Sequence, residues 1–351
     1  MRRKWKLPTL LAGGLAAVLL ISILWAGSTS ITAFSAYNSE WDGGSTVRAE
    51  ADAAGGSSIV ATDTEIYEEV QSNRTAAIVL SPNEPYTNAD ADRLQQFVSD
   101  GGTLIVADDF GPNTNPLLAE LGFSTRVDGR PVRDNIDNTQ LPDFVVATQV
   151  TESDVTENVE QITLNHGSVL EPNGASVLVQ TSSFAYLDTN RNGELDDEES
   201  VQRYPVVTTE QLGDGRAVII SDPSVFINAM MEREGNARFA QALFSGHETV
   251  VFDHSHSGDV PQFIRVVLAL QQNPLLQALI GLGLLGVIVL VSAYLPSILA
   301  GRRQSAEQVL HAPRGQLREG LVGRHPEWDE DRLNRLMKGF MTDENKERKD
   351  D

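Results

Sequence analysis

The sequence predicts an α/β protein in which a doubly wound sheet lies between two transmembrane helices. Three observations lead to this prediction. Short β-branched apolar runs alternate with helical segments from residue 57 onward. Two uncharged stretches, 7–27 and 274–300, are long and apolar enough to cross a bilayer. The segment between them is strongly acidic, as expected of a domain exposed to solvent.

The first half of the acidic segment repeats a strand-then-helix unit. Strands are predicted at 57–63, 76–82 and 102–109, and they are followed by helices around 64–72, 88–99 and 114–122. Each run is short, rich in Val, Ile and Leu, and bounded by Gly, Asp or Pro, which is typical of buried parallel strands. Strands that alternate with helices in this way predict a doubly wound α/β sheet.

After Pro142 the pattern changes to strands and hairpins. The runs 143–150, 175–188 and 203–223 are rich in β-branched residues, and Gly213, Asp214 and Gly215 predict a tight turn in the last of them. A final helix at 234–245 and a final strand at 248–255 complete the domain, which we place at 36–260.

The two apolar stretches fix a topology. Basic residues 2–4 and 6 precede the first stretch, and Arg302 and Arg303 follow the second. The positive-inside rule therefore places the N-terminus (1–6) and the tail (301–351) in the cytoplasm and the domain outside the cell membrane. A signal peptide cleaved before Ala36 is the alternative for 7–27, but the apolar stretch is longer than usual, which favours an uncleaved anchor.

Charge and cysteine content exclude several functions. The chain has a net charge of −22, and residues 27–273 contain 38 Asp and Glu against 12 Arg and no Lys. Such a surface repels nucleic acid, and it is typical of salt-adapted, haloarchaeal proteins. The chain has no cysteine, which excludes disulfides, thiolate metal sites and thiol nucleophiles.

Four motifs in fixed order carry a family resemblance: "GGTLIVADDFG", "GDGRAVIISDPSVFIN", "GNARFAQALF" and "VVFDHSHSG". They resemble an archaeal membrane family of unknown function, DUF4350. The resemblance implies a flavodoxin-like sheet similar to the class I glutamine amidotransferase fold and to GldG-like transporter subunits. The amidotransferase reaction needs a cysteine, so it is excluded here. Fold alone does not determine function.

Polar residues that follow predicted strands form the candidate ligand site. Asp108, Asp109, Asp222 and His254 each come directly after a strand, and His256 lies two residues further on. Ligands in open α/β sheets bind beyond the carboxyl ends of the strands, so we expect these side chains to converge on one edge. A structural role for the histidines, as hydrogen-bonding groups beside the membrane helix, is the alternative.

The same edge suggests a hydrolase as the alternative function. Asp253, His254 and His256 could ligate a divalent metal or serve Ser221 as a base. No G-x-S-x-G motif occurs, and Ser or Asp at a strand end is more often a helix cap. We therefore expect a binding module without catalytic residues.

Residues 188–199, "DTNRNGELDDEE", match the spacing of a twelve-residue calcium loop. Asp188, Asn190, Asn192 and Glu199 occupy the ligand positions, Gly193 the turn, and Glu194 the position that binds through its backbone carbonyl. Strands are predicted on both sides, so this is not a helix–loop–helix unit. We expect a structural Ca²⁺, with an acidic turn as the alternative.

The tail predicts a protein contact. Residues 325–341 form a helical pattern whose apolar stripe includes Trp328, Leu333, Leu336 and Phe340. Docking on the membrane or on the protein's own second membrane helix is the alternative. Members of the resembled family tend to occur beside a MoxR-type ATPase, which implies a partner of that kind. The predicted function is thus a membrane-anchored interaction subunit of an envelope complex in a halophilic archaeon.

Overall fold

The computed structural model describes residues 32–257 and a few residues beyond them (278, 281–283, 322–323, 328–332 and 334–335). The chain divides into two compact units, Met1–Ala269 and Leu270–Asp351. Both predicted spans lie outside the described residues, except for 278 and 281–283, which are helical. Among the described residues, no helix is long and apolar enough to cross a membrane.

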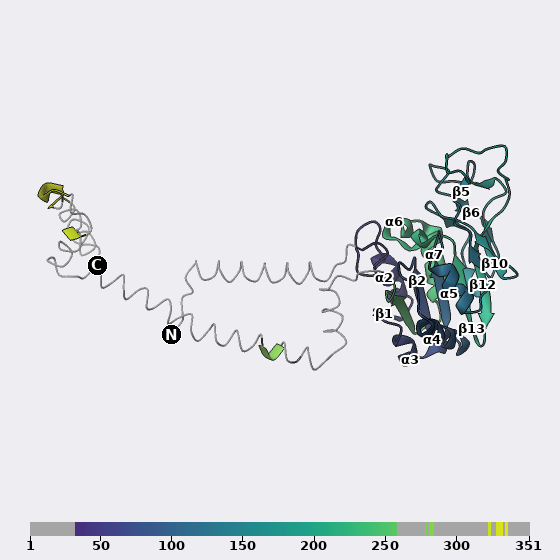
Figure 1. Ribbon diagram of the computed structural model, residues 1–351, viewed down its shortest axis with the longest axis horizontal. Coiled ribbons are helices and arrows are strands. Elements are labelled where there is room, and N and C mark those ends of the chain that lie inside the picture. Colours follow the sequence, from purple (N-terminus) through teal and green to yellow (C-terminus); the bar gives the residue numbers. More distant parts are fainter. Residues whose placement is uncertain are drawn as a thin grey trace. The chain divides into compact units, whose positions relative to one another are not determined.

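An eight-stranded mixed sheet forms the centre of the first unit (Figure 1). Its strands, in spatial order, are β1 (Ser57–Ala61), β14 (Thr249–Asp253), β2 (Thr75–Leu80), β3 (Thr103–Ala107), β13 (Gly215–Ile220), β12 (Pro205–Leu212), β10 (Ser176–Gln180) and β7 (Gln149–Val150). The first five are parallel, and the last three pair antiparallel. The predicted α/β class is confirmed, with a mixed sheet.

Helices pack on both faces of this sheet, as Figure 1 shows. One face carries α2 (Ser45–Ala53) and α7 (Glu234–Phe244), and the other carries α3 (Ile66–Glu69), α4 (Asn88–Ser99) and α5 (Thr114–Glu120). Alternate strand residues point into the two cores: Ile78 and Ile105 face α2 and α7, whereas Val79 and Val106 face α4 and α5. The two layers of helix bury β2 and β3 along their whole length.

The segment between α5 and β12 adds three small antiparallel sheets on the side of the domain where the parallel strands have their carboxyl ends. These sheets pair β11 (Ala185–Leu187) with β5 (Val132–Asp134), β4 (Arg126–Val127) with β9 (Leu170–Glu171), and β6 (Val146–Ala147) with β8 (Ile162–Thr163). The remaining short elements are η1 (Ser72–Arg74), η2 (Asp154–Thr156), η3 (Pro223–Phe226) and α6 (Asn228–Met231).

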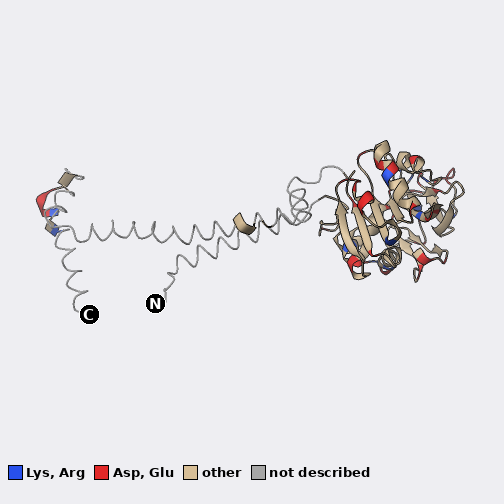
Figure 2. Ribbon diagram, turned by 90° about the horizontal axis from the view of Figure 1, so that it is seen from below, with Lys and Arg blue, Asp and Glu red and all other residues tan. Residues whose placement is uncertain are grey.

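Local signals explain which predicted elements form. Helix α4 occupies the predicted 88–99 because Thr87 and Asp90 make a capping box at its start. The helix predicted at 64–72 is instead two short pieces, because Val70 is extended and ends α3. Helix α2 was not predicted, since its sequence lacks a strong apolar stripe. In the ribbon of Figure 2, acidic residues occur on many separate elements of the domain.

Candidate functional site

Strands β3 and β13 are parallel neighbours whose chains leave the sheet toward opposite faces. After β3 the chain passes to α5 on one face, and after β13 it passes through η3 and α6 to α7 on the other. Such a divergence is the topological switch point at which α/β sheets bind ligands. The register pairs Ala107 with Ile220, so Asp108, Asp109, Ser221 and Asp222 follow directly at this point.

Asp108 shapes the loop that follows β3. The side chain is almost fully buried, and its carboxylate accepts hydrogen bonds from the backbone N–H groups of Asp109 (2.8 Å), Phe110 (3.3 Å) and Gly111 (3.2 Å). All of its partners belong to its own loop. Asp108 therefore has a structural role, that of fixing the direction in which Asp109 and Phe110 leave the strand.

Asp222 is a fully buried carboxyl that joins two loops. It accepts hydrogen bonds from the backbone N–H groups of Asn165 and Ser224 (2.7 Å), and it caps η3. Burial raises the pKa of Asp222 to about 6, although both hydrogen bonds favour the ionised form. Gly167 packs so closely on Asp222 that a Cβ there would lie 2.8 Å from the Asp222 Cβ. The carboxyl is thus covered by the 165–168 loop.

Asp109 is half-buried, and the hydrogen bonds of its carboxyl group are with its own backbone N–H and with Asp108, both in the same loop. Burial, followed by the charges of Asp222 and Asp108, raises the pKa of Asp109 to about 7. Near neutral pH this group is therefore often protonated, and it can both donate and accept a hydrogen bond. The switch point thus presents a carboxyl group with local hydrogen bonds only beside a second, fully buried one.

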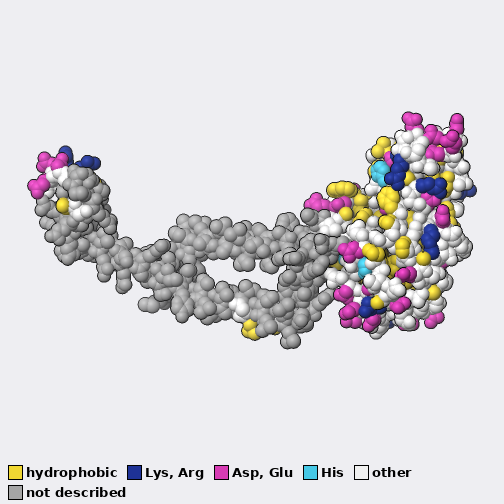
Figure 3. Space-filling view, in the orientation of Figure 1, with side chains coloured by type: hydrophobic (Ala, Val, Ile, Leu, Met, Phe, Trp, Pro, Cys, Tyr) yellow, Lys and Arg dark blue, Asp and Glu magenta, His cyan; other side chains and the backbone are white. Residues whose placement is uncertain are grey.

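Two residues beside the switch point were not singled out by sequence analysis. Phe110 is 54% exposed, and the Arg191 guanidinium lies 5.8 Å from its ring centroid. Arg191 belongs to the predicted calcium loop, so that loop contacts the switch point. A large aromatic residue directly after the strand-end "DD" pair was the available signal. Figure 3 shows one face of the domain, with hydrophobic side chains scattered over its middle and acidic side chains mostly toward its edges.

His254 lies in a different environment, because β2 separates β14 from β3. Its Nε2 accepts a hydrogen bond from the backbone N–H of Ala36 at 3.3 Å. Burial lowers the pKa of His254 to about 4, so the ring is neutral. The structure thus brings Asp108, Asp109 and Asp222 together and places His254 against the start of the domain.

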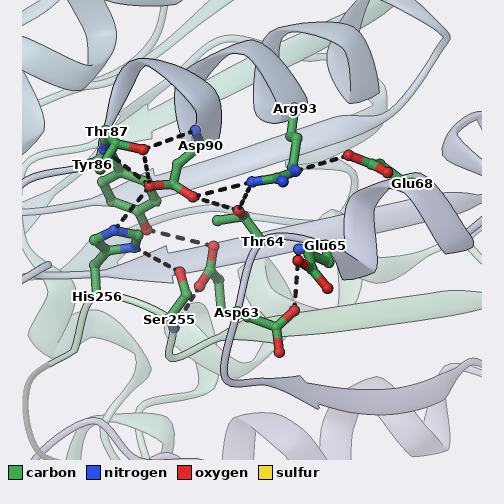
Figure 4. Close-up of polar contacts among 11 residues, drawn as sticks. Asp63, Thr64, Glu65, Glu68, Tyr86, Thr87, Asp90, Arg93, Ser255 and His256 are labelled. Atoms are coloured by element: carbon green, nitrogen blue, oxygen red, sulfur yellow. Dashed lines mark hydrogen bonds and ion pairs between the residues drawn. The ribbon is translucent and has the colours of Figure 1, made fainter.

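His256 is part of a hydrogen-bonded network beyond β14 and β2 (Figure 4). Its Nδ1 lies 2.7 Å from the Ser255 hydroxyl, its Nε2 lies 3.5 Å from Asp90, and its ring stacks on Tyr86 at 3.8 Å. Asp253 accepts a hydrogen bond from the Tyr67 hydroxyl at 2.7 Å and one from the Ser255 N–H at 2.8 Å. His254 and His256 therefore point to different partners and do not share a ligand.

Asp90 is the most strongly hydrogen-bonded carboxylate of this network. The Thr64 and Thr87 hydroxyls each lie 2.6 Å from it, and Arg93 lies 3.5 Å away. Burial alone would raise the pKa of Asp90, but the hydrogen bonds from Thr64 and Thr87 outweigh it, and the pKa is lowered. Asp90 is thus a stable anion next to His256.

The predicted calcium loop is closed by its own side chains. Asp188, which is fully buried, accepts hydrogen bonds from the backbone N–H groups of Asn192 and Gly193, both at 3.0 Å. Gly193 has a φ of +84°, as the sharp turn requires. The side-chain amides of Asn190 and Asn192 meet at Asp196, at 2.7 and 2.8 Å. Asp188, Asn190 and Asn192, which occupy three of the predicted ligand positions, thus lie close together in this turn.

Two contacts in the loop compete with a cation. Arg133 Nε lies 2.7 Å from the Asp188 carboxylate, and Glu199 accepts hydrogen bonds from the backbone N–H groups of Thr189 and Asp196. The side chain of Glu194 is exposed. Calcium would therefore need Glu199 to rotate inward and the amide oxygens of Asn190 and Asn192 to replace their N–H groups. Within the described residues, no three His, Cys, Asp or Glu side chains are grouped to hold a metal ion.

Comparison with known families decides the relationship that the motifs suggested. The family model "Domain of unknown function (DUF4350)" matches residues 36–244. The chain belongs to the DUF4350 family. The match covers the central sheet up to α7, and the archaeal origin and the membrane location that we associate with this family stay predictions. No curated protein matches the sequence.

Several solved structures share part of the fold at low identity. The N-terminal domain of mmIFT52 is 17% identical, with 52% of this chain and 80% of that chain covered and a TM-score of 0.41. Cytoplasmic protein STM1381 from Salmonella typhimurium LT2 is 14% identical, with 56% and 79% covered and a TM-score of 0.33. The beta-galactosidase from the haloarchaeon Halorubrum lacusprofundi is 16% identical (TM-score 0.30). This chain spans 22% of its length. These similarities carry no information on function.

Proposed function

We propose that this DUF4350 protein is a membrane-anchored binding module, held between spans at 7–27 and 274–300 with its α/β domain outside the cell. The observation that best supports the anchoring is the hydrogen bond between the Ala36 N–H and His254 Nε2. It joins the beginning of the domain to the end of its last strand. A domain carried by two neighbouring membrane helices needs its two ends at one place, and this domain has them there.

The ligand is proposed to bind at the β3–β13 switch point, without turnover. Asp109 supports this role, because it is a half-buried carboxyl whose hydrogen bonds are confined to its own loop. Its raised pKa allows it to donate and accept hydrogen bonds at neutral pH. A neutral polar group or an amine on the ligand would satisfy it. The flavodoxin-like resemblance supports the same edge of the sheet.

Calcium is proposed as a structural ion of the 188–199 loop rather than as a catalyst. The curled backbone around Asp188, Asn190 and Asn192 supports this proposal. The ion would offset the repulsion among the carboxylates of the loop. Through Arg191 and Phe110 its binding would also stabilise the rim of the switch point.

The tail is proposed to dock on a protein partner in the cytoplasm, such as a MoxR-type ATPase. Within the predicted helix, residues 330–332 and 334–335 are helical, and Arg332 lies 5.3 Å from the Trp328 ring centroid. These observations support the predicted helix in this part of the tail.

The absence of cysteine allows a direct test of the topology. Single cysteines are introduced at Ser183, an exposed residue of the domain, and at Ser305 in the tail. We expect a membrane-impermeant maleimide to label Ser183→Cys in intact cells and to label Ser305→Cys after lysis alone. The unsubstituted chain, which has no thiol, is the matched control. Labelling of Ser305→Cys in intact cells, or protection of Ser183→Cys, would contradict the proposed orientation.

A further inference from the structure

The turn after β14 holds three side chains in the order that nucleophilic catalysis requires. Ser255 is partly exposed in this turn, and its hydroxyl lies 2.7 Å from Nδ1 of His256 and also hydrogen-bonds with Asp253 and Tyr86. Asp90 lies 3.5 Å from Nε2, on the other side of the ring. A nucleophile within 2.6–3.2 Å of a base that a third group orients is the general signature of an activated serine. Figure 4 shows the three side chains in this sequence.

The surroundings fix the imidazole in the required state. The Asp90 carboxylate is an anion 3.5 Å from Nε2, which favours a proton on Nε2 of the neutral His256 ring and leaves Nδ1 to accept the Ser255 hydroxyl proton. Stacking on Tyr86 prevents rotation of the ring. The backbone N–H groups of Asn83 and Glu84 hold the His256 carbonyl, at 2.8 and 3.1 Å. The geometry is therefore set before any substrate arrives.

A donor for a developing oxyanion is also present. The backbone N–H of His256 makes no hydrogen bond within the described part of the chain. In serine hydrolases the N–H of the residue after the nucleophile contributes to the oxyanion hole. This N–H occupies the same position relative to Ser255.

We propose that Ser255 is a nucleophile for acyl transfer, with His256 as its base and Asp90 as the orienting group. The Ser255 oxygen bonds to the carbonyl carbon of an ester, and its proton passes to His256 Nδ1. The tetrahedral intermediate expels the alcohol, which takes this proton from His256. Water, deprotonated by His256, then hydrolyses the acyl-serine, releases the acid and restores the hydroxyl. This chemistry goes beyond the proposed binding function and uses a separate part of the sheet edge.

Local charge selects the substrate class. Asp90, Asp253, Glu68 and the exposed Asp63 lie within the same network or beside it (Figure 4). Arg93 is paired with Glu68 and Asp90, so among the described residues of this network no unpaired cation is left for a phosphate. A negative field of this kind repels anionic phosphate esters. Neutral carboxylic esters are therefore the expected substrates.

The test uses the full-length chain in detergent and molar NaCl. It is treated with a tagged fluorophosphonate, a neutral reagent that traps activated serines, and the modified residue is located by mass spectrometry. We expect the adduct on Ser255, and none in Ser255→Ala. His256→Asn should slow labelling by about 100-fold or more, in the range typical of a lost general base. Ser257→Ala, a change two residues further along the same turn, should label at the wild-type rate.

Folding is monitored by circular dichroism, so that loss of labelling is not confused with loss of structure. Absence of an adduct on Ser255 in the folded wild type would overturn the proposal. So would an equal rate of labelling in folded His256→Asn. Either result would mean that these hydrogen bonds serve to hold the turn. The topology and the binding site proposed above would be unaffected by it.

Discussion

The two halves of the carboxyl edge of the sheet treat their carboxyl groups in opposite ways. Beyond β14 and β2, Asp90 and Asp253 are held by hydroxyl and backbone donors; the pKa of Asp90 is lowered, whereas burial raises that of Asp253. Beyond β3 and β13, the hydrogen bonds of the Asp109 carboxyl are confined to its own loop, and its pKa is raised to about 7. The first half is internally satisfied, whereas the second leaves hydrogen-bonding capacity for a ligand.

Within one edge of the sheet, one half is therefore held rigid and the other half is able to bind a ligand. A fully hydrogen-bonded network fixes its side chains in one geometry, which suits a preorganised nucleophile. A partly buried carboxyl with few donors destabilises the free protein, and a ligand that supplies a donor recovers that free energy. Removal of the Asp253 carboxyl should therefore destabilise the first half, whereas removal of the Asp109 carboxyl should stabilise the second.

The largest expected effect is on the β14 half. Asp253→Ala leaves the buried Tyr67 hydroxyl and the Ser255 N–H without their acceptor. We expect the free energy of unfolding to fall by about 2–4 kcal/mol, measured by chemical denaturation in molar NaCl. Asp63→Ala, which removes an exposed carboxylate near the same network, should change it by less than about 0.5 kcal/mol. Equal effects of the two changes would contradict the account of a cooperative network.

Calcium should stabilise the loop that contacts the β3–β13 half. At a hundredfold excess over its dissociation constant, an ion that binds the folded form alone adds about 2.7 kcal/mol and raises the melting temperature. Glu199→Gln should abolish most of this increase, and Mg²⁺ should produce less of it. Asp197→Asn removes a neighbouring charge that is not at a ligand position, and it should keep the increase. Absence of a calcium effect in the wild type would mean that the loop is an acidic turn closed by the ion pair between Arg133 and Asp188, and not a calcium site.

The smallest effect concerns the pH dependence of the β3–β13 half. Unfolded carboxyls titrate near pH 4, whereas folded Asp222 and Asp109 titrate at about 6 and about 7. Between these values the folded state holds more protons, so raising the pH from 4 to 7 lowers the free energy of unfolding. Asp109→Asn should reduce this slope and stabilise the domain by about 1 kcal/mol at pH 8, because solvent screens the half-buried group.

Melting curves from pH 5 to pH 8 measure this prediction. Asp92→Asn, at an exposed position of α4, removes the same charge and serves as the control. If both variants follow the wild-type slope, the Asp109 carboxyl is not the group that titrates.

The sequence by itself determined the class of fold and the position of most elements. Apolar β-branched runs predicted β1, β2, β3 and β14, because strands buried on both faces need such residues throughout. The Thr87 cap placed the start of α4. Calcium-loop spacing predicted the turn around Gly193, since all of its contacts are local in the chain. Each of these signals depends on residues that lie within about twelve positions of one another in the chain.

The tertiary structure decided which strand ends are neighbours. Strand β14, the last in the sequence, inserts between β1 and β2, and this separates His254 from Asp109 although both follow strands. Pairing of β3 with β13, more than a hundred residues apart, brings Asp109 beside Asp222. The turn after β14 then places His256, which contacts the Ser255 hydroxyl, beside Asp90 on α4. Strand order and register depend on packing between distant segments, so local sequence patterns determined the parts of this edge but not their partners.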